Sequence, residues 1–371
     1  MKVSDFSKLK IAIVSDWLTN YGGAESVIEF FCEIFPEADL LTTIFVSENM
    51  KNLGRKQVKT SFLQKFPKRI REKHRVFLSL LPMAIESLDL TGYDLVISSS
   101  SFVGKGALTN PDTLHVSYVH TPARFLWGEY REFVDSYPLP RFLKFFLPPI
   151  LHRIRKWDAA SSARPDFIIA NSDFIKERIW KFWQRDSVVL FPPVDTQKFT
   201  ICEQKEDFYL FAGRLVPQKD IVFLVEAFNA MPQEKLRIIG TGPMQKILKK
   251  KARSNIEFLG YVSDEVLGDN FQKAKATIFP HVEDAGIVPL ESLASGTPVI
   301  AYNKGGVKTS LNGQVAVFFD RQDVDSFKDA IQEFSERDFD PVVLRERAEQ
   351  FSKDNFKRRF LEILRGFYDQ R

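Results

Sequence analysis

Short apolar runs alternate with amphipathic segments along the whole chain. Many runs are β-branched and apolar at every position, which is typical of parallel strands covered by helices on both faces. In the first half they predict strands at 11–15, 39–43, 95–98, 115–118, 167–170 and 188–190. In the second half they predict strands at 208–212, 236–239, 256–259, 277–279, 299–301 and 315–319. Apolar residues recur at helical spacing between the runs, so the pattern predicts an α/β fold with doubly wound parallel sheets.

This strand–helix pattern occurs twice, on either side of a polar break within residues 194–207. The repetition predicts two Rossmann-like domains, at 1–193 and 194–352, that face each other across a cleft. A last helix is expected near 354–368, after a helix that begins at Pro341. The terminal segment 353–371 could cross back to the first domain.

Composition narrows the class of protein. The chain has 371 residues, of which 44% are hydrophobic and 27% charged, as in ordinary soluble domains. A net charge of +4 is too small by itself to indicate nucleic acid, and no nucleic-acid recognition module is present. The two cysteines, Cys32 and Cys202, have no metal-ligand spacing, which argues against a disulfide framework or a zinc site and favours a reducing compartment.

Membrane-spanning and secretory segments are not predicted. The first apolar run, Ile11 to Val14, is too short for the core of a signal peptide. No run approaches the roughly 18 apolar residues of a spanning helix. We expect a cytoplasmic protein that is at most peripheral to a membrane.

The clearest candidate site is residues 283–291, where Glu283 and Glu291 have seven residues between them. An apolar run ends at Pro280, and a helix is predicted from Pro289 to Ser295, with Pro289 at its first position. Free N–H groups at a helix start attract phosphate, and carboxylates accept hydrogen bonds from hydroxyls. The motif therefore predicts a site for a sugar nucleotide.

Glycines and cations follow other predicted strands of the second half. Gly213, Arg214 and Lys219 come after the first of these strands, where both cations could reach a diphosphate. The alternative is that they are solvated surface cations. A second turn, at 240–243, contains Gly242, but no glycine turn of the chain has the dinucleotide fingerprint with its distant acid. A nicotinamide or flavin cofactor is therefore disfavoured.

Two candidates lie in the first half. His120 follows a predicted strand end, where ligand-facing residues are expected. The alternative is a structural histidine that caps the loop. Gly22 and Gly23 follow the first strand and let the backbone approach a ligand at the start of a helix. The alternative there is a tight turn without a ligand.

Together these segments resemble the family 4 glycosyltransferases, which have the GT-B fold of two facing Rossmann-like domains. The resemblance spans nearly the whole chain in the expected order. Its most specific part is the Glu-x7-Glu motif with the Gly-Thr-Pro-Val tail at 296–299. The residues that carry it are 22–25, 120–122, 213–215 with Lys219, 240–243, 283–291 and 294–301.

The resemblance implies roles for these residues. Glu283 would contact hydroxyls of the donor sugar and Glu291 the ribose. Lys219 and Arg214 would neutralise the departing diphosphate, and His120 would touch the donor sugar near the reacting centre. The remaining implied donor contacts are Gly22, Gly23, Gly213, Gly242, Gly286, Ile287 and Val288. The resemblance also implies retention of anomeric configuration and no bound metal or other cofactor, with GDP-mannose or a UDP-hexose as the donor.

Two positions depart from the family pattern. Ala285 stands where an aromatic residue is common, so a roomier donor pocket is expected there. After Gly305-Gly306 the family often places an acid, but this chain continues with 307–310, Val-Lys-Thr-Ser. A changed nucleotide or phosphate contact is expected as a result.

The basic excess is concentrated in two stretches of the first half, 51–75 and 141–157, and both also carry bulky apolar residues. This mixture is typical of surfaces that bind anionic bilayers. The alternative is a solvated charged face whose aromatic residues pack inward. On the first reading, the acceptor would be a lipid-linked saccharide or oligosaccharide of cell-surface polysaccharide synthesis. The candidate membrane or acceptor residues are Lys65, Lys68, Arg69, Arg71 and Lys144.

The leading hypothesis is a retaining hexosyltransferase, with mannose slightly preferred by family likeness. One alternative is a sugar-nucleotide epimerase of the same fold, but no extra carboxylate pair for proton abstraction is evident. A second alternative is a non-catalytic donor-binding subunit of a polysaccharide assembly complex. Donor hydrolysis or transfer in vitro distinguishes the three.

Overall fold

The computed structural model describes residues 6–50, 53, 57–137, 144–202 and 204–370. Two compact units emerge from it. Unit 1 comprises Met1–Leu190 together with Lys357–Arg371, and unit 2 comprises Phe191–Phe356. The change from unit 1 to unit 2 lies close to the polar break in the sequence.

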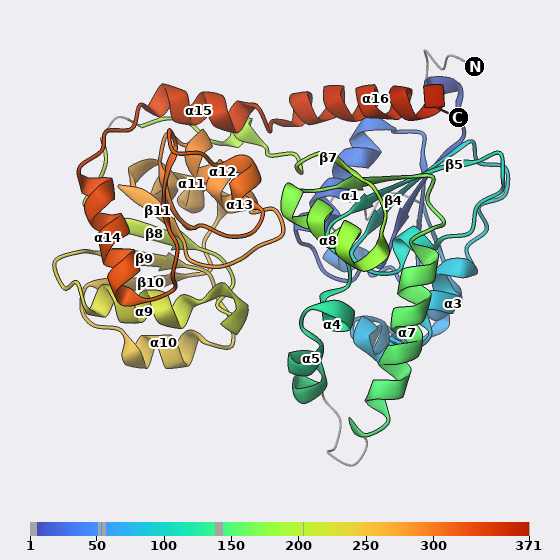
Figure 1. The fold of residues 1–371 in the computed structure, drawn as a ribbon, viewed down its shortest axis with the longest axis horizontal. Helices are drawn as coiled ribbons and strands as arrows, with labels where there is room; N and C mark the ends of the chain where they lie inside the picture. The colour runs from blue at the N-terminus through green and yellow to red at the C-terminus, as the bar shows by residue number, and fades with distance from the viewer. Residues whose placement is uncertain (1–5, 51–52, 54–56, 138–143, 203, 371) are drawn as a thin grey trace. The chain divides into compact units, whose positions relative to one another are not determined.

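Unit 1 is built on a parallel sheet (Figure 1). Its described residues form seven strands in the order β3-β2-β1-β4-β5-β6-β7. Ile13 of β1 lies opposite Leu40 of β2 on one side and Ile97 of β4 on the other. The strands are β1 (Ile11–Ser15), β2 (Asp39–Thr42), β3 (Val58–Thr60), β4 (Leu95–Ser100), β5 (Leu114–Val119), β6 (Phe167–Ala170) and β7 (Val188–Val189).

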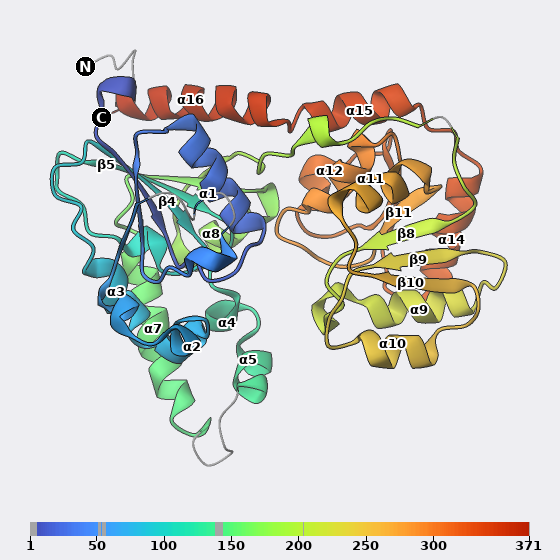
Figure 2. The ribbon, with the colours of Figure 1, turned by 180° about the vertical axis from the view of Figure 1, so that it is seen from behind.

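Helices cover both faces of this sheet (Figures 1 and 2). They are α1 (Gly23–Ile34), α2 (Lys68–Arg71), α3 (Leu81–Glu86), α4 (Arg124–Trp127), α5 (Tyr130–Ser136), α7 (Leu147–Ser161), α8 (Asp173–Trp183) and α16 (Lys353–Gln370). On one face, Val14 belongs to a buried cluster with Leu81 of α3 and Leu151 of α7. On the other face, Phe31 of α1 contacts both Tyr118 of β5 and Phe360 of α16. From Lys357 onward, the terminal helix is therefore part of unit 1.

Unit 2 has the same design, and its described residues form six parallel strands in the order β10-β9-β8-β11-β12-β13. The strands are β8 (Tyr209–Ala212), β9 (Leu236–Ile239), β10 (Ile256–Gly260), β11 (Ala276–Phe279), β12 (Val299–Tyr302) and β13 (Ala316–Phe319). The helices are α9 (Ile221–Asn229), α10 (Gln245–Lys251), α11 (Asp264–Lys273), α12 (Ile287–Ala294), α13 (Val307–Ser310), α14 (Val324–Ser335) and α15 (Pro341–Glu349). Side chains alternate between the two faces, because Leu210 packs with the α12 cluster and its neighbour Phe211 with the α9 cluster.

Short 3-10 turns complete the described structure. They are η1 (Phe6–Lys8), η2 (Ser47–Asn49), η3 (Phe62–Lys65), η4 (His74–Phe77), η5 (Gly104–Gly106), η6 (Thr196–Lys198) and η7 (Pro217–Lys219). Of these, η5 and η7 follow β4 and β8 and bear on the candidate sites.

The predicted doubly wound α/β architecture is confirmed. Strand β3 was missed because it is a short edge strand with Lys59 at its centre, inside a basic stretch that has no apolar run. The prediction that Pro289 opens its helix is wrong, because α12 begins at Ile287. Gly286 adopts φ +89°, which lets the chain enter the helix two residues earlier. Pro289 is still tolerated, because the N–H groups of the first turn have no intrahelical acceptor.

The strand orders also show where ligands are expected. In each sheet the order reverses beside the first strand of the unit, between β1 and β4 in unit 1 and between β8 and β11 in unit 2. Open α/β sheets bind ligands beyond the carboxyl ends of strands at such switch points.

Candidate functional site

The switch point of unit 2 brings together a cation, a histidine and a carboxylate. Lys219 ends η7 after β8, and its Nζ donates a hydrogen bond to Oε2 of Glu283, beyond the end of β11. The Nε2 of His281 lies 2.9 Å from Lys219 Nζ and 3.1 Å from Glu283 Oε2. The Glu283 side chain is 34% exposed, that of Lys219 16% and that of His281 only 3%. The Glu283 carboxylate thus remains accessible to a ligand, whereas the His281 ring is buried and contacts it from the protein interior.

Electrostatics keep this carboxylate ionised. Burial by itself would raise the pKa of Glu283, but the hydrogen bond from His281 and the charge of Lys219 bring that pKa down to about 2. Burial also lowers the pKa of His281, so its ring is neutral near pH 7. A neutral ring whose Nε2 carries the proton can donate to Glu283, which leaves Nδ1 as the buried nitrogen without a partner. At neutral pH the site therefore presents one anionic acceptor and one ammonium group.

Close backbone packing fixes the loop that carries Glu283. The Gly306 N–H donates to the Glu283 carbonyl at 2.8 Å. A Cβ added at Gly306 would lie 2.2 Å from the Asp284 carbonyl oxygen, so only glycine fits there. Residues 307–310, which depart from the family pattern after Gly305-Gly306, form the short helix α13. The side chain of Val307 in this helix is buried. Ala285 is buried in the α12 cluster, so its methyl group packs inward in this structure.

The loop after β8 is held in a similar way by the turn after β9. Leu215 N–H donates to the Thr241 carbonyl at 2.9 Å, and Gly213 N–H donates to Ile239 at 3.0 Å. A Cβ added at Gly242 would lie 2.3 Å from the Leu215 carbonyl oxygen. The observed reason for glycine at this position is thus packing between two loops.

Helix α12 begins directly after this site. Gly286 is its N-cap, and the half-buried Ile287 and Val288 form its first turn. The N–H groups of a first helical turn lack intrahelical acceptors and favour anions. Glu291 lies about one turn further along α12.

Glu291 differs electrostatically from Glu283. Among the described residues, its carboxylate accepts no hydrogen bond, and burial raises its pKa to about 7. The Glu291 side chain is half-buried, and a carboxylate that loses part of its hydration without gaining a hydrogen bond costs stability unless a ligand supplies a partner.

We therefore expect Glu291→Gln to stabilise the empty protein at pH 8 but not at pH 5. The folded-state pKa lies above the unfolded value, so the stability linked to protonated Glu291 is present below about pH 4.5 and is lost as the pH rises through 7. The gain at pH 8 should be about 1–3 kcal/mol, seen as a higher melting temperature. Glu265→Gln, at an exposed position of α11, is the control. An equal change at both pH values would contradict the burial of an unpaired carboxyl group.

Arg214 is exposed and, within the described part of the chain, forms no ion pair. It shares the loop after β8 with Lys219. The structure thus brings Lys219 and Glu283 into contact, places Arg214, Gly213 and Glu291 in the same unit, and leaves the Arg214 guanidinium in solvent.

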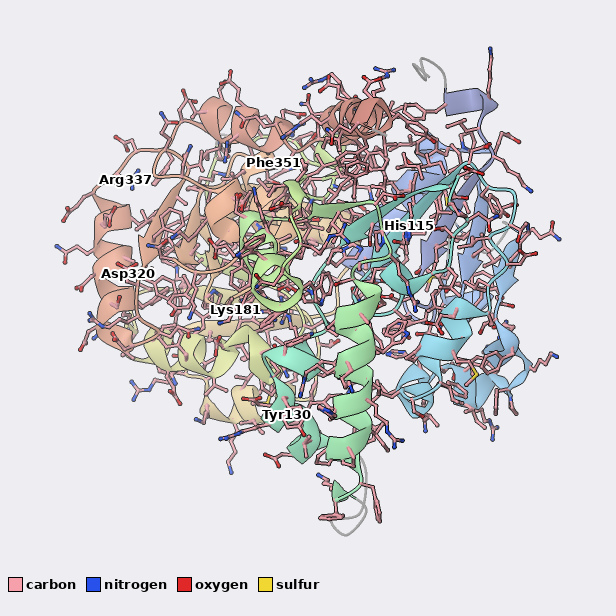
Figure 3. The ribbon with its side chains drawn as sticks, turned by 45° about the vertical axis from the view of Figure 1, so that its right-hand side comes forward. His115, Tyr130, Lys181, Asp320, Arg337 and Phe351 are labelled. Atoms are coloured by element: carbon pink, nitrogen blue, oxygen red, sulfur yellow. The ribbon has the colours of Figure 1, made fainter. Side chains whose placement is uncertain are left out.

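His120 lies in unit 1, just past the end of β5. Its Nε2 is 2.8 Å from Ser99 Oγ at the end of β4, and its carbonyl accepts a hydrogen bond from Asn171. Burial lowers the pKa of His120 to about 4, so the ring is neutral at pH 7. His115, which is labelled in Figure 3, belongs to β5 itself. Its side chain is fully buried, and its Nε2 lies 2.9 Å from Ser98 Oγ. His115 is the structural histidine of this strand, whereas His120 is partly exposed at the strand's carboxyl end.

The switch point of unit 1 is organised by Asp16, a residue that the sequence analysis did not single out. Its carboxylate accepts hydrogen bonds from the backbone N–H groups of Ser101, Phe102 and Gly104. Burial raises the pKa of Asp16, although these hydrogen bonds and the charge of Lys105 oppose the rise. The Asp16 carboxylate therefore ties the loop after β4 to the end of β1.

The predicted glycine turn opens α1, with Gly22 as the exposed N-cap and Gly23 as the first helical residue. Burial raises the pKa of Glu25 to about 7, against hydrogen bonds from the N–H groups of Glu25 and Gly22. A glutamate at this position that accepts from the N-cap N–H caps its own helix. This part of the turn therefore has a structural role whether or not a ligand binds beside it.

The basic residues predicted for membrane or acceptor contact lie in unit 1. Lys65, Lys68 and Arg69 are exposed, although Lys68 pairs with Glu48 at 2.8 Å. Arg71 donates to the Phe45 carbonyl at 2.8 Å, and Lys144 donates to the Asp135 carbonyl. These last two cations thus have structural partners. Lys51, Arg55, Lys56 and 141–143, which the sequence analysis included in its basic stretches, lie outside the described residues.

Large apolar side chains are exposed beside these cations. Phe145 is 80% exposed and Phe146 59% at the start of α7. The other exposed apolar side chains of these two stretches are Phe66, Ile70 and Ile150. The alternative of inward-packed aromatic residues therefore does not describe Phe66, Phe145 and Phe146. It does describe Phe62 and Trp157, which pack against the buried cluster of α3 and α7. Within the described residues, no helix is both long and apolar enough to cross a bilayer.

Sequence reasoning missed His281 and Asp16. Both lie two residues after the last apolar residue of a strand, which was a usable signal, but neither belongs to a spaced motif. Their contacts come from strands that are neighbours only in the folded sheet.

Comparison with known proteins places these sites in a family. A curated relative, an uncharacterized glycosyltransferase of Methanocaldococcus jannaschii, is 35% identical over 124 residues, which are 30% of this chain and 32% of that protein. The O-antigen chain mannosyltransferase RfbU of Salmonella typhimurium is 27% identical over 151 residues, 38% of this chain and 43% of its own. The alignments thus span less than half the length of these relatives.

Solved structures share the fold over a longer range. A crystal structure of Anabaena HepE in complex with UDP has a TM-score of 0.71 at 15% identity, covering 96% of this chain and 99% of that one.

The family model described as glycosyltransferase family 4 matches residues 21–198. The model described as glycosyl transferases group 1 matches residues 195–358, which include the Lys219–Glu283 pair and α12. Because the two matches follow one another along nearly the whole chain, it belongs to the group 1, family 4 glycosyltransferases.

Proposed function

We propose that this protein is a retaining glycosyltransferase that moves a hexose from a nucleoside-diphosphate sugar to a lipid-linked or oligosaccharide acceptor. The reaction would serve the synthesis of cell-surface polysaccharide or glycolipid. The observation that carries the proposal is the Lys219–Glu283 contact beside the start of α12, at the switch point of unit 2. This arrangement offers charge for a diphosphate and an ionised acceptor for sugar hydroxyls.

In the proposed complex, the diphosphate binds the N–H groups at the start of α12, near Gly286, Ile287 and Val288. Glu291 accepts hydrogen bonds from the ribose, which supplies the partner that its carboxyl group lacks in the empty protein. Glu283 accepts hydrogen bonds from hydroxyls of the donor sugar. Gly213 and Gly242 keep the backbone of the surrounding loops close to the donor.

Lys219 and Arg214 supply the positive charge that the leaving group requires. As the bond between the anomeric carbon and the phosphate oxygen breaks, negative charge grows on the diphosphate, and fixed cations stabilise it. We propose that these side chains and α12 do this without a resident metal. Lys219 reaches the phosphate with N–H donors that are not used by Glu283, because an ammonium group carries three of them.

The acceptor hydroxyl attacks the anomeric carbon from the face that the diphosphate leaves. The new carbon–oxygen bond forms as the old one breaks, and the departing phosphate oxygen takes the hydroxyl proton. No carboxylate nucleophile is assigned, because Glu283 and Glu291 hold hydroxyls in this scheme. His120, neutral at pH 7, contacts the donor sugar, and Gly22 and Gly23 lie near the donor or acceptor.

Two donor classes are tested first. GDP-mannose is one class, because RfbU is a mannosyltransferase and a relative from Corynebacterium glutamicum is a GDP-mannose-dependent mannosyltransferase. UDP-hexoses are the other class, because a protein of the same fold was crystallised with UDP.

The experiment that tests the function incubates the protein with GDP-mannose or a UDP-hexose and polyprenyl-diphosphate-linked sugars. We expect nucleoside diphosphate release that depends on the acceptor, and NMR of the product should show an α-linkage from an α-linked donor. A β-linked product would contradict retention. Epimerisation of the nucleotide sugar, or binding without turnover of any donor, would instead support the epimerase or the non-catalytic subunit.

We also propose that unit 1 docks on the anionic cytoplasmic surface of a membrane, where a lipid-linked acceptor would be held. Support comes from exposed cations next to exposed aromatic side chains, notably Lys65 and Arg69 beside Phe66, and Phe145 with Phe146. Cations attract anionic headgroups, and aromatic rings enter the interface.

Neutralising Lys65, Lys68 and Arg69 to Gln is expected to reduce binding to vesicles of anionic phosphatidylglycerol at least tenfold. Each cation near such a surface contributes about 1 kcal/mol, and added salt should weaken the binding of the unchanged protein. The matched control removes the same charge from α10 with Lys246, Lys249 and Lys250 changed to Gln. If the fraction of protein that floats with the vesicles falls equally for both variants, net charge alone attracts the protein. That result would contradict a docking surface at Lys65, Lys68 and Arg69.

A further inference from the structure

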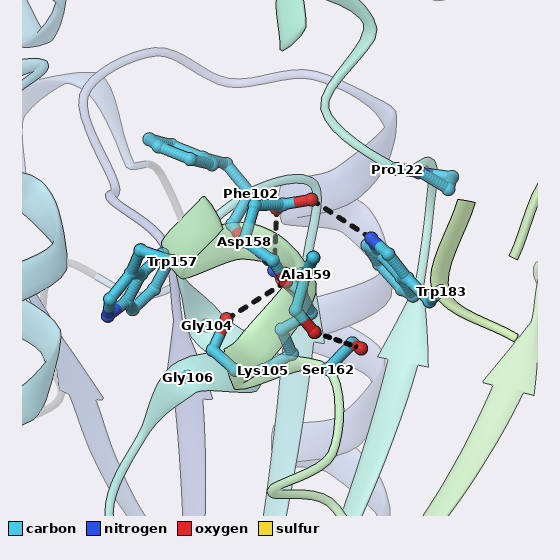
Figure 4. Close-up of polar contacts among 12 residues, drawn as sticks. Phe102, Gly104, Lys105, Gly106, Pro122, Trp157, Asp158, Ala159, Ser162 and Trp183 are labelled. Carbon is cyan, nitrogen blue, oxygen red and sulfur yellow. Dashed lines mark hydrogen bonds and ion pairs between the residues drawn. The ribbon is translucent and has the colours of Figure 1, made fainter. Parts of the chain in front are cut away.

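A buried charged cluster lies beneath the carboxyl edge of the unit 1 sheet (Figure 4). Lys105 of η5 and Asp158 of α7 form an ion pair of 2.7 Å between side chains with no exposed surface. The Lys105 Nζ also donates to the Phe102 carbonyl at 2.8 Å. The other oxygen of Asp158, Oδ2, accepts hydrogen bonds from the indole N–H groups of Trp127 at 2.8 Å and Trp183 at 2.9 Å.

This cluster joins segments that are far apart in the sequence. Lys105 belongs to the loop after β4. In the same loop, the N–H groups of Ser101, Phe102 and Gly104 donate hydrogen bonds to Asp16. Trp127 ends α4, the short helix that follows the loop of His120. Its ring stacks on Phe182 at 5.0 Å, in a hydrophobic cluster that also contains Val119, the residue before His120.

Burial of such a pair is a weak way to stabilise a fold. Apolar side chains of similar volume often replace a buried ion pair without loss, because desolvation of the charges offsets their attraction. A buried carboxylate with charged and indole donors does, however, fix the directions of its partners. The cluster is therefore better suited to placing the two loops than to adding stability.

We infer that Asp158, oriented by Lys105, is a positioning residue for the carboxyl-edge loops of unit 1, and that it acts on the His120 loop through Trp127. The inference rests on the proposed function, in which this edge meets the donor sugar and acceptor. Asp158 itself is fully buried and touches no substrate. A second hydrogen bond, from Arg155 Nε to the Leu126 carbonyl at 2.6 Å, joins the same two helices, so we expect α4 to stay folded when Trp127 loses its bond.

The two tryptophans provide a matched test. Trp127→Phe and Trp183→Phe each remove one indole hydrogen bond to the same oxygen and keep an aromatic ring. For the active donor and acceptor pair, we expect Trp127→Phe to lower kcat at least fivefold with donor KM unchanged within twofold. Trp183→Phe, at the end of α8, should leave kcat within twofold of the unchanged protein. Similar falls for both variants, or no fall for either, would overturn the inference.

A second variant separates positioning from stability. Lys105→Met combined with Asp158→Leu replaces both charges by apolar side chains. The melting temperature should fall, because the two indole N–H groups and the Phe102 carbonyl lose their partners. We expect kcat, measured well below that temperature, to fall at least tenfold. In 15N-tryptophan spectra, the indole N–H signals of Trp127 and Trp183 should move upfield as they lose the carboxylate. Unchanged kcat with displaced indole signals, or failure of this variant to fold, would assign the pair to stability alone and overturn the inference.

Failure of the proposed function is seen separately in these experiments. It would appear as absence of nucleotide binding and turnover in the unchanged protein. If the unchanged protein transfers sugar and the Trp127 and Asp158 variants keep its kcat, only the positioning role of Asp158 is overturned.

Discussion

Replacing Lys219 by Met is expected to lower sugar transfer about 100- to 1000-fold, the largest effect of any single side chain in unit 2. The change removes the ammonium group that contacts Glu283 and that would stabilise the departing diphosphate. Affinity for the nucleoside diphosphate product should fall at least tenfold, because the ground-state phosphate loses the same charge. Steady-state kinetics and calorimetric titration with the product measure the two effects.

The matched control is Lys251→Met. Lys251 also pairs with a carboxylate of unit 2, Glu226, at 2.8 Å, but it ends α10 on the surface of the unit. We expect transfer by this variant to stay within twofold of the unchanged protein. A comparable loss in both variants would show that charge on unit 2 matters in general, and the role of Lys219 at the diphosphate would be contradicted.

The second large effect is expected from Gly306→Ala. The added methyl group would meet the Asp284 carbonyl oxygen at 2.2 Å and the Ala285 Cα at 2.6 Å, so the loop that carries Glu283 must move. Catalytic geometry tolerates little displacement, and a shift of about 1 Å can cost 100-fold in rate. We expect at least a 100-fold loss of transfer and about 1–3 kcal/mol of lost stability.

Gly313→Ala is the control for this change. It lies in the same unit, and an added methyl group there meets no atom within 4 Å. Its melting temperature and transfer rate should remain close to those of the unchanged protein. Gly306→Ala with full activity would mean that the position of the 283–285 loop does not matter for the reaction.

Much of the donor side of this account was predictable from the sequence. Alternating apolar runs located the strands, and three predicted strands, 11–15, 167–170 and 236–239, have the observed bounds. Parallel strands that are covered on both faces need apolar residues at every position, so their runs are easy to detect. The carboxyl ends of those strands then directed attention to Lys219 and Glu283, which are in contact.

Other features could not be predicted because they depend on which strands become neighbours. His281 acquires its role only because β8 and β11 pair at the switch point, which brings Lys219 to it. The Lys105–Asp158 pair joins the loop after β4 to α7, and no local pattern around either residue indicates an ionic partner. The start of α12 was placed two residues late because Pro289 is a strong start signal, whereas the left-handed Gly286 sets the entry.

The central claim is that unit 2 holds a nucleoside diphosphate between Lys219, Glu291 and the start of α12. Calorimetric titration of the full chain with GDP and with UDP tests it most directly, using the unchanged protein, Lys219→Met and Glu291→Gln. We expect saturable one-site binding of at least one of the two nucleotides, weakened tenfold or more by each substitution. Binding of neither nucleotide, or binding of equal strength in all three proteins, would contradict it.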